Sequence, residues 1–131
     1  MKGIESQNLF SKDTMNHIFP EDRTDKFFDA LYGDAEEGAY DISFNFKELK
    51  HHKLMFEFQL TQRSGKCLVC NLTYGLPEVF SRHPIINIKE IIQKIDTKLP
   101  DGIRCIEWTI GNTVEVSSTL HVIPVTILIS E

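Results

Sequence analysis

Cysteine is scarce in this sequence, and its number is odd. The 131 residues contain three cysteines, whereas small proteins held together by disulfides carry a denser, even-numbered set. We therefore expect free thiols in a reducing compartment, which indicates the cytoplasm. A chain of this length can bury an independent core without a disulfide or a metal. We also expect no cofactor.

Long apolar runs and basic clusters are missing too. No stretch approaches the roughly 20 apolar residues of a membrane span, and the first residues, MKGIESQNLFSKD, lack the apolar run of a secretory signal. The net charge is −5, whereas nucleic acids and anionic membranes both need a basic partner surface. We therefore expect neither a nucleic acid nor a membrane as a partner.

The motifs of common enzyme classes are also missing. The sequence contains no glycine-rich phosphate loop, no nucleotide fingerprint, no Gly-x-Ser-x-Gly elbow and no His-Glu-x-x-His pair. This favours a non-enzymatic protein over an enzyme.

Alternation of apolar and polar residues is the clearest positive signal. Three runs within residues 40–47, 54–61 and 67–74 alternate with a period of two, which is typical of an antiparallel sheet with one buried face. The short connections 48–53 and 62–66 predict a three-stranded meander. The side chains expected to point inward are Tyr40, Ile42, Phe44, Phe46, Leu54, Phe56, Phe58, Leu60, Leu68, Cys70, Leu72 and Tyr74.

Two segments have helical periodicity. A short helix is predicted over Asp25–Tyr32, with Thr24 as its N-cap and Gly33 at its end. A second helix begins after Asn87 and ends before Pro100. Its apolar stripe consists of Ile88, Ile91, Ile92, Ile95 and Leu99.

The last third of the chain has the pattern of further strands. Residues 103–110 and 113–117 flank Gly111-Asn112, which predicts a β-hairpin. The tail, residues 119–130, is a further strand in which Pro124 marks an edge position or a bulge. This tail is too apolar for an uncovered edge, so it either lies between strands or is covered by a second copy, and we expect a homodimer. The side chains expected to point inward here are Ile106, Trp108, Ile110, Val114 and Val116.

These elements predict an N-terminal arm, residues 1–20, and a single α+β domain, residues 21–131. The domain has two layers, an antiparallel sheet of five to six strands with two helices on one face. The element order is α-β-β-β-α-β-β, with or without a further strand. This order resembles that of the type III secretion chaperones, which are also small acidic α+β proteins, although no sequence motif is shared and that family's closing helix is missing here.

Four groups of residues are candidate sites. Cys67-Leu-Val-Cys70 matches a redox or zinc spacing, but in a strand the two sulfurs point to opposite faces, which favours a packing role. Tyr74, Arg82 and His83 could line a pocket, or the segment could be an ordered connection. The third is the acidic segment Glu21–Glu37, which is a docking surface for a basic partner, a cation site at Asp34, Glu36 and Glu37, or a solvated face. The fourth is the pair His51-His52, expected at an exposed hairpin tip.

The function favoured by these observations is a small non-enzymatic interaction domain, an adaptor or chaperone-like protein with a protein partner. Its candidate binding residues are Tyr74, Arg82, His83, Glu36 and Glu37. The alternative is a small-molecule-binding protein or enzyme with a pocket near Tyr74, Arg82 and His83. A third hypothesis is a cysteine-based metal or redox protein.

Overall fold

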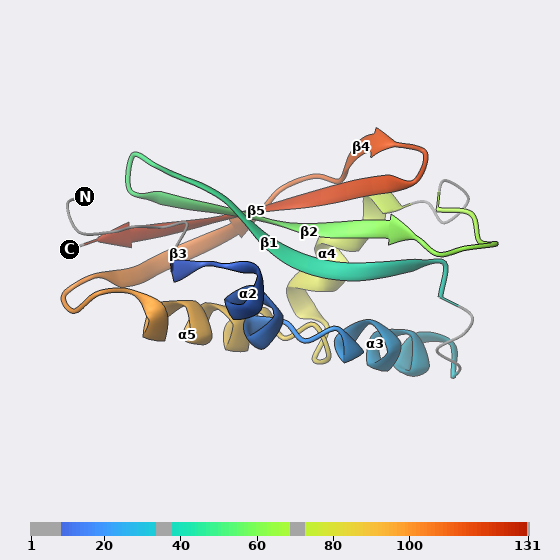
Figure 1. Cartoon of the computed structure of the whole chain (residues 1–131), viewed down its shortest axis with the longest axis horizontal. Coiled ribbons are helices and arrows are strands. Elements are labelled where there is room, and N and C mark those ends of the chain that lie inside the picture. Colours follow the sequence, from blue (N-terminus) through green and yellow to red (C-terminus); the bar gives the residue numbers. More distant parts are fainter. Residues whose placement is uncertain (1–8, 34–37, 69–72, 131) are drawn as a thin grey trace.

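The computed structural model describes residues 9–33, 38–68 and 73–130. In these ranges a five-stranded antiparallel sheet lies against helices on one face, so the predicted α+β fold is confirmed (Figure 1). The strands are β1 (Tyr40–Lys50), β2 (Lys53–Gln62), β3 (Arg104–Ile110), β4 (Val114–Ser117) and β5 (Leu120–Ser130). The helices are α2 (Lys12–Ile18), α3 (Asp22–Tyr32), α4 (Leu76–Arg82) and α5 (Ile88–Lys98), with a 3-10 turn, η3 (Thr73–Gly75), before α4.

Strands β1 and β2 form the hairpin that the alternation predicts. Their turn is only His51 and His52, with φ of 50° and 63°, the left-handed conformation that suits the right-handed twist of a hairpin. The predicted exposed tip is confirmed. Phe44 and Phe58 face each other across the pair, with ring centroids 4.8 Å apart. The buried face of this hairpin therefore builds much of the aromatic core.

The predicted third strand of the meander is wrong wherever the structure describes it. Residues 67 and 68 are irregular, and residues 73–75 form η3; residues 69–72 lie outside the described residues. Leu68 is buried as expected, but Tyr74 is exposed and Thr73 is buried, which reverses the predicted phase. The free side of β2 pairs instead with β5, far away in sequence.

The predicted hairpin between residues 103–110 and 113–117 is also wrong. Strands β3 and β4 do not pair with each other; both run along the same side of β5. They are interrupted opposite Pro124, whose carbonyl accepts a 2.8 Å hydrogen bond from the Gly111 N–H. Because proline has no N–H to return, the ladder breaks at this point, and the Gly-Asn pair bridges the break rather than turning the chain.

The inward direction predicted for Ile106, Val114 and Val116 is wrong. A register shift between Cys105 and Glu107 makes Ile106 a bulge residue, and all three side chains are exposed. Beyond this bulge the strand is in the expected phase, so Trp108 and Ile110 pack against the core.

Strand β5 lies between β2 on one side and β3 and β4 on the other. Its core-facing residues are fully or almost fully buried, among them Ile123, Val125 and Ile127. The structure therefore shows that the apolar tail lies between strands. The homodimer stays a prediction, but β5 no longer argues for it.

The two predicted helices are confirmed with changes at their starts. Helix α3 begins at Asp22, so Thr24 is not its N-cap but lies inside it; Gly33 does end it, at φ 79°. In α5 the predicted cap is confirmed, since the Asn87 side chain accepts a hydrogen bond from the Glu90 N–H.

The described part of the N-terminal arm is integrated into the domain. It contains a helix that the sequence analysis did not predict, α2, whose Met15 and Ile18 are buried. Phe10 packs against Phe46 and Phe56, with ring centroids 5.1 and 5.2 Å away. Phe19 contacts Phe58 in the same way. This segment therefore contributes directly to the aromatic core.

One ion pair between α3 and α5 positions the segment that joins α4 to α5. Arg23 on α3 donates to the Ile85 carbonyl at 3.1 Å and to Glu90 on α5 at 2.8 Å. Lys94, one turn further along α5, donates to the carbonyls of His17 and Ile18 at the end of α2. Lys94 also lies 2.9 Å from the Glu90 carboxylate. Hydrogen bonds from Lys94 and Arg23 keep the pKa of Glu90 below its ordinary value.

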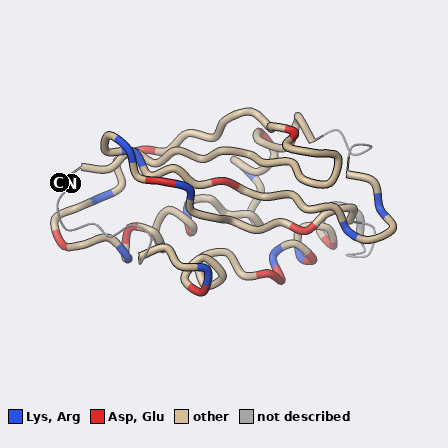
Figure 2. The backbone as a smooth tube through the Cα atoms, turned by 45° about the horizontal axis from the view of Figure 1, so that its top comes forward, with Lys and Arg blue, Asp and Glu red and all other residues tan. Residues whose placement is uncertain are grey.

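Charged residues are spread over the molecule. Figure 2 shows Lys and Arg interspersed with Asp and Glu rather than gathered on one face. In the acidic segment, Asp22 pairs with Lys26 and Asp25 pairs with Arg63. None of the helices in the described ranges has the length and apolar character needed to cross a bilayer.

Candidate functional site

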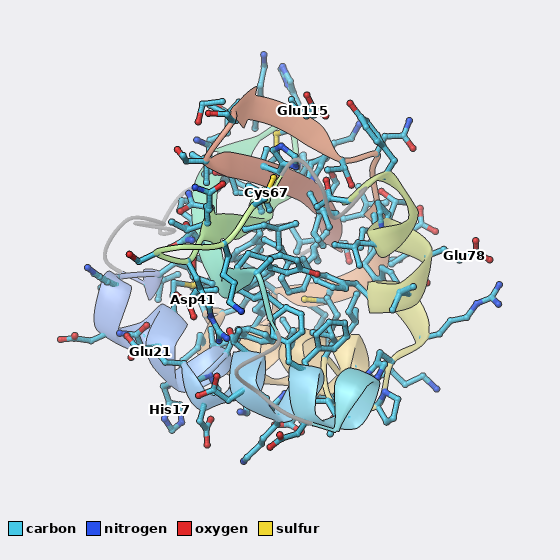
Figure 3. The ribbon with its side chains drawn as sticks, turned by 90° about the vertical axis from the view of Figure 1, so that its right-hand side faces the viewer. His17, Glu21, Asp41, Cys67, Glu78 and Glu115 are labelled. Carbon is cyan, nitrogen blue, oxygen red and sulfur yellow. The ribbon has the colours of Figure 1, made fainter. Side chains whose placement is uncertain are left out.

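Helix α4 packs Phe80, and in part Leu76, against the core and presents its remaining surface to solvent. Phe80 is fully buried, with its ring 5.5 Å from that of Phe27 and 5.1 Å from that of Phe58. Pro77 lies in the first turn, where helical N–H groups have no intrahelical partner and proline costs little. The side chains of Glu78, Val79 and Arg82 are exposed on the other side of α4, and Figure 3 shows Glu78 pointing outward.

A shallow groove runs along this outer surface. It has a volume of about 430 Å³ and is lined by Gly75, Glu78, Val79, Arg82, His83 and Pro84. Val79 is 39% exposed and forms its apolar floor together with Pro84. The groove is therefore built from one short helix and the residues that directly follow it.

The orientation of His83 is set by its neighbours. Its ring packs edge-on against Phe27 at 4.8 Å, and its Nδ1 accepts a 3.2 Å hydrogen bond from the Ile85 N–H. In the neutral ring the proton is therefore on Nε2, which is a donor. Partial burial lowers the pKa of His83 below its ordinary value, and this favours the neutral ring.

Arg82 has only a weak tie to the protein. Its guanidinium lies 3.4 Å from the Glu78 carboxylate, and the two side chains are 78% and 74% exposed. Such exposed pairs contribute little to stability, so Arg82 is available to a ligand.

A second hollow continues the groove past Arg82, His83 and Pro84. Its volume is about 240 Å³, and it reaches the start of α5 and the side chain of Trp108 on β3. The residues that it adds to the lining are Ser81, Asn87, Ile88, Lys89 and Trp108. Sequence analysis missed these residues, although the strand phase of Trp108 and the position of Lys89 on the polar face of α5 were visible in the sequence.

Tyr74 does not line the groove. It is 63% exposed and donates a 2.8 Å hydrogen bond to Glu115 on β4. This hydrogen bond to the carboxylate raises the pKa of Tyr74. Of the three residues predicted to share a pocket, the structure thus brings together only Arg82 and His83.

Behind Tyr74 lies a buried polar cluster that the sequence analysis overlooked. Thr73 Oγ1 lies 2.6 Å from His121 Nδ1, and the Thr113 hydroxyl donates to the Thr73 carbonyl at 2.7 Å. His121 Nε2 is buried and has no hydrogen-bond partner among the residues that the structure describes. The strand phase of Ile123, Val125 and Ile127 was the signal that places His121 on the buried face.

The cysteines differ from the prediction. Cys67 is exposed, lies outside any strand and is disulfide-bonded, so the expectation of a free thiol on a strand face is wrong. Cys70 lies outside the described residues. Cys105 is a free thiol, and burial, together with the neighbouring Asp96, raises its pKa to about 12. Cys105 is therefore unreactive at neutral pH.

The structure does not place the acidic candidates. Glu36 and Glu37 lie outside the described residues, so their docking role stays a prediction. Among the described residues, His, Cys, Asp and Glu form no group of three that could hold a metal ion. Comparison of the chain with protein-family models, with curated proteins and with solved structures finds no significant match.

Proposed function

We propose that this protein is a non-enzymatic interaction domain, an adaptor or chaperone-like protein, whose protein partner docks in the groove on α4. The observation that carries this proposal is the exposed Val79 and Pro84 floor, rimmed by the charged side chains of Glu78 and Arg82. An apolar surface with a polar rim is typical of a protein-binding site.

The chemistry of the groove also favours binding over catalysis. Ser81 is the hydroxyl nearest to His83 in sequence, and its Oγ donates to the Glu78 carbonyl at 2.8 Å. The Nδ1 of His83 is occupied by the Ile85 N–H. His83 is therefore not arranged as a general base towards Ser81, because nucleophilic catalysis requires a hydrogen bond between the two side chains.

The test is a substitution on the groove floor with a matched control. Native-level co-purification followed by mass spectrometry should lose the partner with Val79→Asp. Val116→Asp makes the same chemical change at a side chain that is 59% exposed on β4, outside the groove, and should keep the partner. Circular dichroism should show that both variants are folded. An unchanged set of partners with Val79→Asp would exclude the groove as the docking site.

The acidic segment provides a rival docking surface within the same function. Charge reversal at Glu36 and Glu37 should leave the partner bound if it docks on α4. If the partner is lost with Glu36→Lys and Glu37→Lys but kept with Val79→Asp, the docking site lies on the acidic segment and not on α4.

A small-molecule ligand is the second candidate function, favoured by the groove's volume of about 430 Å³, which falls within the range of ligand pockets. A thermal shift confined to one class of metabolite, and lost in Val79→Asp, would support it.

A redox role is favoured by the exposed disulfide at Cys67, because exposed disulfides are the more easily reduced ones. Thiol counting on protein trapped by rapid alkylation in cells tests this role and the location together. A reduced Cys67 would support the cytoplasmic location expected from the sequence. An oxidised Cys67 would point to an oxidising compartment.

A further inference from the structure

The two hollows beside α4 differ in chemistry although they share Arg82, His83 and Pro84. The larger one has the apolar floor of Val79 and contains Glu78. The smaller one contains Lys89 and Trp108, and no carboxylate is among its lining residues. A ligand that occupies both would therefore meet an apolar surface at one end and a cationic one at the other.

Three side chains that carry hydrogen-bond donors line the shared region and the smaller hollow. Within the described part of the chain, the exposed pair with Glu78 is the single ion pair of Arg82. Lys89 forms no salt bridge with any residue in the described ranges. His83 Nε2 carries the proton of the neutral ring, because Nδ1 accepts from the Ile85 N–H. These groups complement an acceptor of negative charge, and a guanidinium fits a carboxylate with two parallel hydrogen bonds.

We infer that the partner segment is a peptide in which an acidic side chain lies next to an apolar one. The apolar side chain packs on Val79 and Pro84, and the carboxylate reaches Arg82 and Lys89 in the smaller hollow. The occupant is specified by charge complementarity: the smaller hollow is lined by Arg82, His83 and Lys89 and by no carboxylate, so its local charge attracts an acidic side chain. This inference rests on the proposed docking function.

The probe is a library of random linear peptides displayed on phage. The full-length protein should enrich peptides with Asp or Glu beside an apolar residue. Binding of an enriched peptide should weaken as salt is added. The variant Arg82→Glu/Lys89→Glu should bind the same peptide roughly tenfold more weakly or worse and should enrich Lys or Arg peptides from the library instead.

A matched control removes the effect of net charge. Lys12→Glu/Lys50→Glu makes the same change in net charge at two exposed lysines that line neither hollow, and it should enrich the wild-type peptides. If the control variant shifts the selection as far as Arg82→Glu/Lys89→Glu does, the local cationic surface is not the cause and the inference falls.

The remaining outcomes separate the inference from the proposed function. Enrichment of apolar peptides without acidic residues, lost in Val79→Asp, would overturn the inference and leave the docking function standing. If the wild-type protein enriches no peptide more strongly than the Val79→Asp variant does, both the inference and the proposed docking function are overturned.

Discussion

The hydroxyl of Thr24 on α3 binds both backbone polar groups of Ile42 on β1. Thr24 Oγ1 donates to the Ile42 carbonyl at 3.1 Å and accepts from the Ile42 N–H at 2.9 Å, and all of these groups are buried. Because β1 is an outer strand of the sheet, these groups face no strand among the described residues. A helix side chain therefore closes the edge that would otherwise be open to another chain.

Thr24→Val should test this relationship. The substitution keeps the shape of the side chain but leaves the buried N–H and C=O of Ile42 without partners. We expect a loss of about 1–3 kcal/mol in the free energy of unfolding, measured by urea denaturation. Thr97→Val, which removes an exposed hydroxyl bonded to the Lys94 carbonyl, should change it by no more than about 0.5 kcal/mol. Equal effects of the two substitutions would refute the role of Thr24.

Gly111→Ala should destabilise the protein through a steric clash. A Cβ at this position would lie 2.7 Å from Cγ of Pro124. Strand β5 lies in the interior of the sheet and cannot move away freely, so we expect a cost of about 1–3 kcal/mol. The thermal midpoint should fall accordingly.

Gly75→Ala is the matched control for this experiment. Its φ is −83°, and a Cβ there would meet no atom within 4 Å. It should leave stability unchanged or raise it by up to about 1 kcal/mol, because alanine restricts the unfolded chain. A Gly111→Ala variant as stable as Gly75→Ala would show that β3 and β4 are not held against Pro124.

Ile18→Ala tests whether the N-terminal segment belongs to the core. Ile18 is fully buried, so removing most of its side chain should cost about 2–5 kcal/mol in urea denaturation. Val116→Ala, at an exposed position on β4, should cost no more than about 0.5 kcal/mol. If Ile18→Ala is equally mild, α2 does not pack as described.

His83 should make stability depend on pH. Burial lowers its pKa in the folded protein, whereas in the unfolded chain it titrates near about 6.5. The unfolded chain therefore binds the proton more readily. The stability contributed by neutral His83 is fully present above about pH 6.5 and declines as the pH falls below that value.

The measurement is the urea midpoint of the wild type and of His83→Gln at several pH values between about 7 and 5. Glutamine retains an acceptor for the Ile85 N–H but does not titrate. The wild-type midpoint should fall more steeply towards acid than that of the variant. Parallel curves would contradict the role assigned to His83.

The parts of the fold that were predictable are those in which local pattern and tertiary packing agree. The alternation around Phe44 and Phe58 and the stripe that includes Ile91 in α5 each bury the face that the sequence indicates. Asn87 caps α5 through a hydrogen bond three residues away in sequence. Such features depend on neighbouring residues and can be recognised without knowing the sheet order.

The predictions were wrong where one local sequence pattern is compatible with two structures. Residues 73–75 continue a strand-like alternation, but Phe80 must reach Phe27 and Phe58, and a helix places it there. Gly111-Asn112 is a good hairpin turn, but Pro124 makes it a bridge across a gap in the ladder. The candidate site could not be predicted for the same reason, since the groove exists only because α4 is a helix.

The sequence by itself determined the class of fold, the two main helices and the buried face of β1 and β2, because periods of 2 and 3.6 residues are local properties. Only the tertiary structure decided that β5 lies between β2 and the broken edge of β3 and β4, that α2 enters the core, and that α4 presents its groove beside Trp108. The physical reason is that the strand order, the positions of the bulges and the packing of helices on the sheet depend on contacts between residues far apart in the chain. These contacts form only when the whole core assembles, so a local sequence pattern does not reveal them.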